Sequence, residues 1–173
     1  ARDFNGLNAV FSYTFVRSEF EGTDGNYIPT AWDNRHLISI TATQGIGKSW
    51  DAGFRWRFVG GAPYTPFDLD KSSFIDAWNV SGQGYLDYAN FNSGRLKGFS
   101  QLDIRIDKQF YFDRWSLMLY LDVQNVYNYK AQQPPILVLD PDQTGALPGR
   151  YNLKFIDGDA GTVLPTIGII IEI

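Results

Sequence analysis

Charged side chains lie on the polar face of three alternating stretches of this chain, because a spacing of two residues keeps side chains on one face of an extended strand. They are Arg55 and Arg57 in one stretch, Asp103, Arg105 and Asp107 in a second, and Asp122 in a third. If the two later stretches form a hairpin that turns about 112–113, Asp103 falls opposite Asp122, and Arg105 lies diagonal to both. Arginine can bridge such carboxylates or hold a charged ligand. We therefore expect a polar track whose charges satisfy one another within the wall of the fold, or contact another part of the protein or a passing substrate.

The residue types needed for catalysis or metal binding are scarce. The chain contains no cysteine and one histidine, His36, which excludes thiolate chemistry and any site built from several histidines. No G-x-S-x-G nucleophile motif accompanies His36, so we interpret it as an interface contact. Loop carboxylates lack the spacing of a calcium-binding EF-hand and are expected to be solvated: Asp68, Asp70, Asp76 and Asp87. We predict no enzyme, no metal and no cofactor, and the net charge of −4 gives no reason to expect nucleic acid.

Six segments that must position the charged residues alternate between apolar and polar side chains, as half-buried strands do. They cover 7–15, 38–43, 50–58, 102–110, 115–124 and 165–173. The apolar columns of the third, fourth and fifth segments are about nine residues long, close to the 9–11 that a tilted strand needs to cross a bilayer. Aromatic residues cap these columns and predict a girdle at each membrane interface: Trp50, Phe58, Phe110, Trp115 and Tyr127.

The connections between these segments alternate between short and long. Short turns are expected near GIGKS (45–49) and YFDR (111–114), and long connections over 20–33, 60–97 and 128–164. This alternation is typical of antiparallel barrels in bacterial outer membranes. Residues 136–139 and 151–155 are expected to form short strands above the membrane, and the last strand needs a partner for its edge.

Four segments in order resemble the C-terminal barrel part of TonB-dependent outer-membrane receptors, in the form found in Bacteroidetes. They are GGAPYTPFD (60–68), FSQLDIRIDKQFYF (99–112), WSLMLYLDVQNVYN (115–128) and TVLPTIGIIIEI (162–173). The resemblance implies an all-β transmembrane barrel of about 22 strands, a plug folded inside it, and energised import of a scarce nutrient such as a siderophore, glycan or peptide. Six strands are too few for such a barrel. Residues 1–173 are therefore expected to be its C-terminal part, without the plug, although Ile173 departs from the family's usual aromatic ending.

The resemblance also implies partners: outer-membrane lipid, the rest of the barrel and its plug, the TonB complex through the missing N-terminal part, and a surface lipoprotein. The charged track then lines the lumen. Aromatic residues in the loop 60–97 would contact a ligand or pack the loop into a cap: Tyr64, Phe67, Trp78, Tyr85 and Tyr88. The alternative is a soluble β-sandwich that binds carbohydrate, which explains the alternating strands and the loop aromatics but not the alternating connection lengths.

Overall fold

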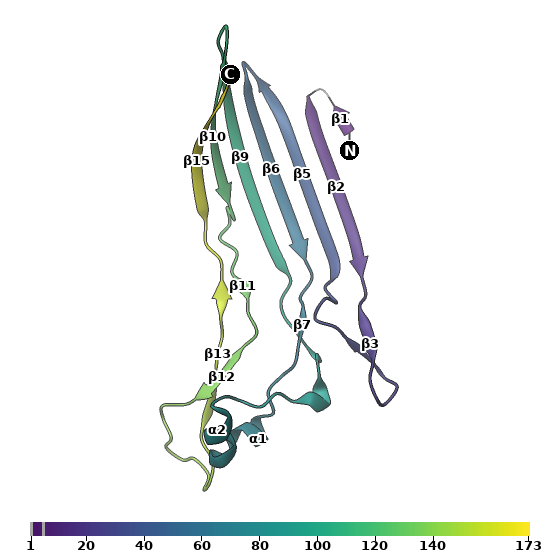
Figure 1. Cartoon of the computed structure of the whole chain (residues 1–173), viewed down its shortest axis with the longest axis vertical. Coiled ribbons are helices and arrows are strands. Elements are labelled where there is room, and N and C mark those ends of the chain that lie inside the picture. Colours follow the sequence, from purple (N-terminus) through teal and green to yellow (C-terminus); the bar gives the residue numbers. More distant parts are fainter. Residues whose placement is uncertain (1, 5) are drawn as a thin grey trace.

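The computed structural model describes residues 2–4 and 6–173. Its main feature is one long antiparallel sheet with the strand order β1-β2-β5-β6-β9-β10-β15 (Figure 1). The strands are β1 (Arg2–Phe4), β2 (Leu7–Val16), β5 (Arg35–Gly47), β6 (Trp50–Val59), β9 (Phe99–Tyr111), β10 (Ser116–Gln124) and β15 (Leu164–Glu172). The six predicted strands are confirmed, and β1 adds a short strand that pairs with the start of β2.

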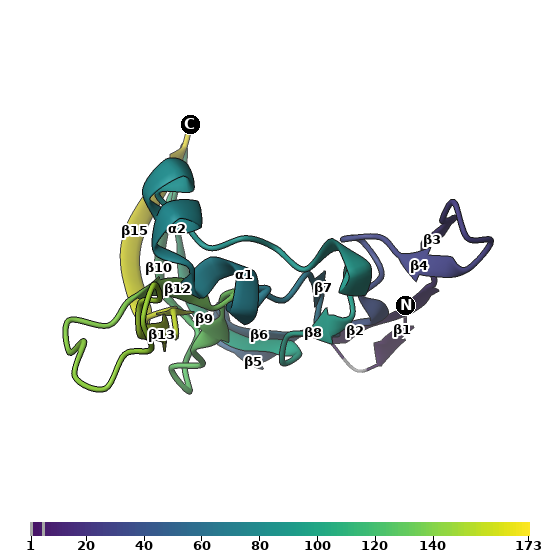
Figure 2. The same ribbon diagram turned by 90° about the horizontal axis from the view of Figure 1, so that it is seen from below.

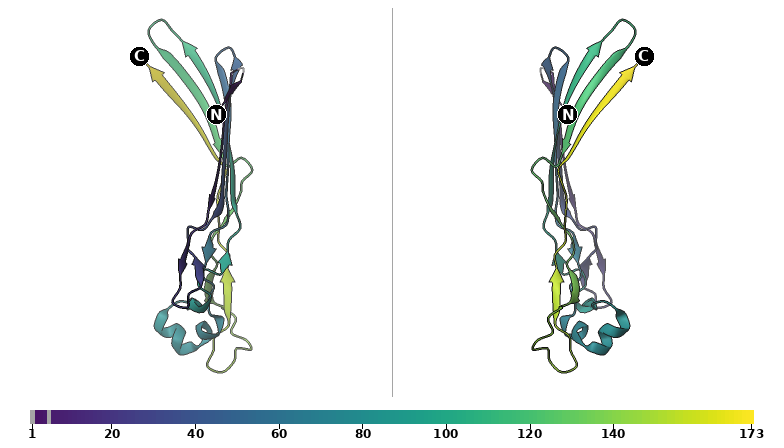
Figure 3. Two further views of the ribbon diagram at one scale, coloured as in Figure 1. Left: turned by 90° about the vertical axis from the view of Figure 1, so that its right-hand side faces the viewer. Right: turned by 90° about the vertical axis from the view of Figure 1, so that its left-hand side faces the viewer.

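The sheet is open and curved. Within the described part of the chain, β15 pairs only with β10, and β2 pairs with β5 and with the short β1. Figure 2 shows the sheet bent into an arc, and Figure 3 shows β9, β10 and β15 leaning away from the other long strands at one end. The fold is therefore a mostly-β protein with six long antiparallel strands that do not close into a barrel.

The short turns lie at one end of the sheet and the long connections at the other (Figure 1). Lys48 and Ser49 join β5 to β6, and both have positive φ angles of 50° and 62°. That conformation suits a two-residue hairpin turn, whose twist matches that of the flanking strands. The turn from β9 to β10 covers 112–115, where the Phe112 N–H donates to the Trp115 carbonyl oxygen at 2.9 Å. The predicted alternation of short and long connections is confirmed.

The long connections contain structure of their own. Their short strands are β3 (Glu19–Glu21), β4 (Tyr27–Pro29), β7 (Pro63–Tyr64), β8 (Gly94–Arg95), β11 (Ala131–Gln132), β12 (Ile136–Leu139), β13 (Leu153–Ile156) and β14 (Asp159–Ala160). The two predicted loop strands exist and pair with each other as β12 and β13. The expectation of an all-β chain was wrong, because the connection from β6 to β9 also contains α1 (Leu69–Ser73), α2 (Ile75–Ser81) and the 3₁₀ turn η1 (Tyr88–Asn90). The Asp68 carboxylate starts α1 by accepting from the Lys71 N–H at 2.9 Å.

Few apolar side chains are buried. Among residues 6–173, the buried apolar side chains are Ala42, Trp78 and Leu137, and the last two belong to the loop end. The chain exposes 11853 Å² of surface, whereas a compact globular protein of this mass would expose about 8,600 Å². No helix among the described residues has the length and apolar character needed to cross a membrane. The long sheet therefore has no core of its own.

Candidate functional site

One face of the sheet is apolar from β2 to β15. One row of directly paired residues consists of Phe11, Ile40, Trp56 and Leu102. Another row, nearer the short turns, consists of Ala52, Ile106, Leu121 and Ile167. Many of these side chains are open to solvent, and Phe11 and Ile167 are 66% and 81% exposed. An apolar surface of this extent marks contact with a membrane or with another protein.

Aromatic side chains lie near both ends of this apolar face. Trp50, Phe110 and Trp115 lie at the short-turn end, where Phe112 and Trp115 stack with their ring centroids 4.1 Å apart. Phe58 lies at the loop end of β6, opposite Ser100, whose hydroxyl is 2.5 Å from the Tyr127 hydroxyl. The five predicted girdle residues therefore form two bands at opposite ends of the face. That these bands sit in membrane interfaces remains a prediction.

Lys108 is the one cation in the apolar face of β9, and sequence reasoning passed over it. It lies opposite Trp50 on one side and Leu119 on the other. Its Nζ lies 5.3 Å from the ring centroids of Trp50 and Phe110, and it donates to the Lys48 carbonyl oxygen in the adjacent turn. The side chain thus carries its charge toward the end of the sheet, as lysine does at an apolar boundary.

His36 also lies on the apolar face, at the loop end of β5. Its Nδ1 lies 3.0 Å from the Tyr13 hydroxyl, and its ring makes an edge contact with Phe15 at a centroid distance of 5.4 Å. These neighbours are two aromatic rings of β2. The arrangement agrees with an interface contact.

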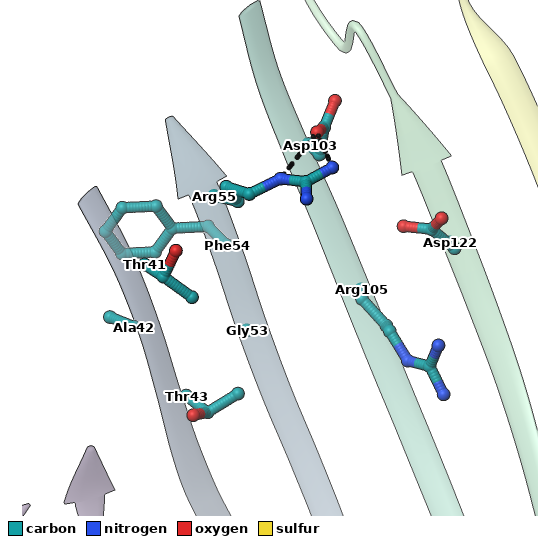
Figure 4. A pocket seen from close by; sticks show the side chains of 9 residues that line it. All are labelled: Thr41, Ala42, Thr43, Gly53, Phe54, Arg55, Asp103, Arg105 and Asp122. Atoms are coloured by element: carbon teal, nitrogen blue, oxygen red, sulfur yellow. Dashed lines mark hydrogen bonds and ion pairs between the residues drawn. The ribbon is translucent and has the colours of Figure 1, made fainter. Parts of the chain in front are cut away.

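The predicted charged residues lie on the opposite face of the sheet. Figure 4 shows four of them projecting from β6, β9 and β10: Arg55, Asp103, Arg105 and Asp122. Figures 2 and 4 together place these side chains on the concave side of the arc, the side on which α1 and α2 also lie. The predicted charged track is thus one continuous feature of the concave face.

The predicted register between β9 and β10 was wrong. Arg105, rather than Asp103, lies opposite Asp122, and Asp103 lies opposite Arg55 on β6. The cause is the turn, which covers 112–115 and is centred one residue later than expected, so that every pair shifts by two residues. Asp103 and Asp122 therefore each face an arginine, and the repulsion expected between them does not arise.

Asp103 is the best-buried charge on the sheet, with 5% of its surface exposed. Its Oδ2 accepts from Nη2 and Nε of Arg55 at 2.9 and 3.2 Å. Its Oδ1 accepts from Nε2 of Gln101 at 2.6 Å and from the N–H of Asn125 at 3.0 Å. Four donors therefore satisfy the carboxylate, as a buried charge requires. Asn125 has a φ of 54° and ends β10, as its place in QNVYN predicts.

Arg105 belongs to a second cluster, nearer the short turns. Its Nε and Nη2 each lie 2.8 Å from Oδ1 of Asp107, and its guanidinium lies 4.2 Å from the centroid of the Tyr120 ring. Tyr120 in turn covers Gly168, where an added Cβ would lie 2.2 Å from the ring. An alanine at 168 would therefore force the Tyr120 ring to move. Sequence reasoning missed this tyrosine, although it alternates with the charged residues.

A hollow of about 310 Å³ lies between the two clusters, over Gly53 (Figure 4). Its polar lining consists of Thr41, Thr43, Arg55, Asp103, Arg105 and Asp122. Hydroxyl groups, guanidinium groups and carboxylates can hold a polar solute by hydrogen bonds. The lining therefore suits a polar solute.

The predicted loop aromatics are mostly packed within the loops. Trp78 is buried, Phe67 lies against Phe155 at a centroid distance of 6.3 Å, and the Tyr85 hydroxyl donates to the Ala77 carbonyl oxygen at 3.3 Å. Tyr64 is partly exposed in β7. Tyr88 is 71% exposed and stacks on Phe91. This packing agrees with a loop cap, and ligand contact by these five residues remains a prediction.

A buried carboxylate at the loop end ties two connections together, and sequence reasoning missed it. Asp33 is 1% exposed and accepts from Nη2 of Arg95 at 2.6 Å and from the Ser18 N–H at 3.1 Å. Burial raises the pKa of Asp33, but the hydrogen bonds and the charges of Arg95 and Arg35 outweigh it and hold the pKa below its usual value. The residue is therefore an anion that fixes the start of β5.

Three of the four loop carboxylates, Asp68, Asp70 and Asp87, make structural contacts. Asp68 and Asp87 accept from backbone N–H groups at the starts of α1 and η1, and Asp70 pairs with Arg150 at 2.6 Å. Within residues 6–173 no group of three or more acidic, histidine or cysteine side chains is arranged to hold a metal ion.

Comparisons with models of protein families, with curated proteins and with solved structures found no match to this chain. The fold described above is therefore established from the structure alone, and the family suggested by the four sequence segments remains a proposal.

Proposed function

We propose that the chain is the C-terminal wall of the barrel of a TonB-dependent outer-membrane receptor, which imports a scarce nutrient. The observation that carries this proposal is the continuous, exposed apolar face on a sheet whose other face is charged. In water such a face would be a liability, whereas in a bilayer it faces lipid. The narrower assignment to TonB-dependent receptors rests on the four sequence segments.

The dimensions of the sheet support a position in a membrane. A column of about nine residues rises about 30 Å along its strand, and a tilt of about 45° reduces this height to roughly 21 Å, close to the apolar band of about 25 Å in outer-membrane barrels. The long connections lie together at one end of the sheet, where such barrels carry their extracellular loops. The chain would then supply wall, lumen lining and loops.

The open edges support a barrel larger than this sheet. The outer edge of β15, and that of β2 beyond the three residues that pair with β1, present backbone groups that need partners, because an unpaired edge in lipid leaves N–H and C=O groups unsatisfied. We infer that further strands of the same barrel pair with both edges. Closure would also make the concave face the lining of a lumen.

The alternative of a soluble carbohydrate-binding sandwich finds less support. A sandwich covers the apolar face of one sheet with the apolar face of a second sheet about 10 Å away. Within the described residues no second sheet lies over the apolar rows, and the remaining sheets have two short strands each. The geometry therefore favours lipid as the partner of this face.

The proposal is tested on the full-length protein, expressed with its export signal and separated into soluble and membrane fractions. We expect it in the outer-membrane fraction, extracted only by detergent, with a gel mobility that changes on heating as the barrel unfolds. A soluble monomer that needs no detergent would overturn the proposal.

A further inference from the structure

We propose that the part of the concave face around Arg57 binds the anionic group, a carboxylate, phosphate or sulfate, of the imported solute. This inference rests on the proposed function in one respect, namely that the concave face lines an aqueous lumen. It adds a chemical class of substrate, which neither the fold nor the sequence segments specify.

Arg57 has an ion-pair partner, Asp103, but no hydrogen-bond acceptor within the described part of the chain. Among the described residues, no acceptor lies within hydrogen-bonding distance of its buried Nε. Its Nη2 lies 3.6 Å from Oδ2 of Asp103, which is too long for a hydrogen bond. Asp103 cannot move to satisfy it without losing other bonds, because its two oxygens already accept from Arg55, Gln101 and the Asn125 N–H.

A buried N–H group that lacks an acceptor is unfavourable, and folded proteins rarely leave one so. The guanidinium group carries five N–H donors in a planar fork that matches the oxygens of a carboxylate or phosphate. The side chain of Arg57 is 39% exposed although its Nε is buried, so a solute from the lumen can reach the open side of the guanidinium group but not Nε itself. An anion in solution can therefore bind the open side of this fork.

The neighbours of Arg57 also favour an anion. Ser39 and Gln101 lie directly opposite it on the two adjacent strands, and Thr41 lies opposite Arg55 in the next row. These groups are neutral and include two hydroxyl donors. The hollow of about 310 Å³ begins in that next row, at Thr41 and Arg55, and gives room for the rest of a small solute.

The distribution of charge along the concave face also favours an anion near Arg57. Toward the loops, Arg55 and Arg57 share one carboxylate, Asp103. Toward the short turns, Arg105 stands among three carboxylates, which are Asp51, Asp107 and Asp122. On the sheet itself, the half of the concave face nearer the loops therefore carries an excess of positive charge, which attracts an anion that has passed the loops.

Arg17 provides a control, because it is a cation outside the hollow and has its own partner. Its Nε donates to Oε2 of Glu19 at 2.9 Å. Replacing Arg17 removes the same charge as replacing Arg57, but it removes no group from the lining of the proposed site.

The test is a titration of the full-length protein in detergent with inorganic phosphate and with sulfate, at constant ionic strength, followed by calorimetry. We expect saturable binding that R57Q weakens at least tenfold, that R57K weakens by a smaller factor because lysine keeps the charge without the fork, and that R17Q leaves within about twofold. Heat-dependent gel mobility, measured on every sample, reports separately whether the barrel has formed.

Two results would overturn the inference. One is equal phosphate binding by the wild type and R57Q. The other is no saturable binding by a wild-type protein that shows the heat-dependent mobility, which would mean that the protein itself supplies the acceptor, for example from an enclosed plug. Both results leave the proposed function standing, since the mobility shift tests it independently.

Discussion

Replacing Leu121 with arginine tests the assignment of the two faces most sharply. Leu121 lies between Ile106 and Ile167 in a row near the middle of the apolar face. An arginine at the midplane of a lipid-facing strand costs about 2–4 kcal/mol of barrel stability, and the cost falls to about 0–1 kcal/mol near the interfaces. We therefore expect L121R to lower the free energy of unfolding by roughly 3 kcal/mol.

Two further arginine substitutions serve as controls. Thr166 lies on the neighbouring strand but on the concave face, opposite Asp122, so T166R should cost less than about 1 kcal/mol. Leu119 lies one row nearer the short turns, opposite Lys108, so L119R should fall between the two. The assay is urea-dependent unfolding and refolding in lipid vesicles, followed by tryptophan fluorescence. A cost for T166R equal to that of L121R would refute the assigned faces.

Three other perturbations follow from the contacts described above. Asp103→Ala leaves the Asn125 N–H and Arg55 without their acceptor. It should lower the free energy of unfolding by about 2 kcal/mol, and not more, because Arg55 is half exposed and regains water. Unfolding by urea measures this loss, and a value below about 0.5 kcal/mol would contradict the hydrogen bonds described for Asp103. In Gly168→Ala the new methyl group collides with Tyr120, which should lower the free energy of unfolding by about 1–3 kcal/mol. Adding Tyr120→Ala should recover most of this loss. Additive losses in the double variant would show that the two residues do not touch. The depressed pKa of Asp33 stabilises the loop end fully above the unfolded value of about 3.9 and loses this effect as the pH falls through the folded pKa. The protection of the β5 start against hydrogen exchange, relative to the intrinsic exchange rate at each pH, should therefore fall in acid. Asp33→Asn should abolish this pH dependence; an unchanged profile in that variant would exclude Asp33 as the cause.

The long strands could be predicted from the sequence because one face of the sheet is apolar and the other is polar, which produces an alternating pattern along each strand. The alternation of Trp50, Ala52, Phe54 and Trp56 with charged residues is a local pattern that needs no tertiary information. The same holds for the turn at Lys48 and Ser49, since a hairpin between two clear strands leaves little choice of position.

The register and the loops could not be predicted in the same way. The pairing of Arg105 with Asp122 depends on the exact length of the turn at 112–115, and an error of one residue in its centre moves every pair by two. The helices α1 and α2 are five and seven residues long, too short for a recognisable helical period, and tertiary packing stabilises them.

The candidate site could be predicted from the sequence only in part. Alternation placed Arg55 and Arg57 on one face correctly, but both have the same sequence signature. Arg55 donates to Asp103, whereas Nε of Arg57 lacks an acceptor. This difference depends on neighbouring strands that are distant in sequence. The buried ion pair of Asp33 and Arg95 joins residues 62 positions apart and leaves no local pattern.

The most direct test of the membrane assignment uses Thr166 and Ile167, which are neighbours in β15 but belong to opposite faces. These 173 residues contain no cysteine, so T166C and I167C, introduced into a full-length protein in which any cysteine elsewhere is replaced by serine, each carry a single fluorescent label in vesicles. We predict that a nitroxide on a lipid chain quenches the label at 167 and that aqueous iodide quenches the label at 166. Quenching of both labels by iodide, with no effect of the lipid nitroxide, would contradict a membrane-spanning wall.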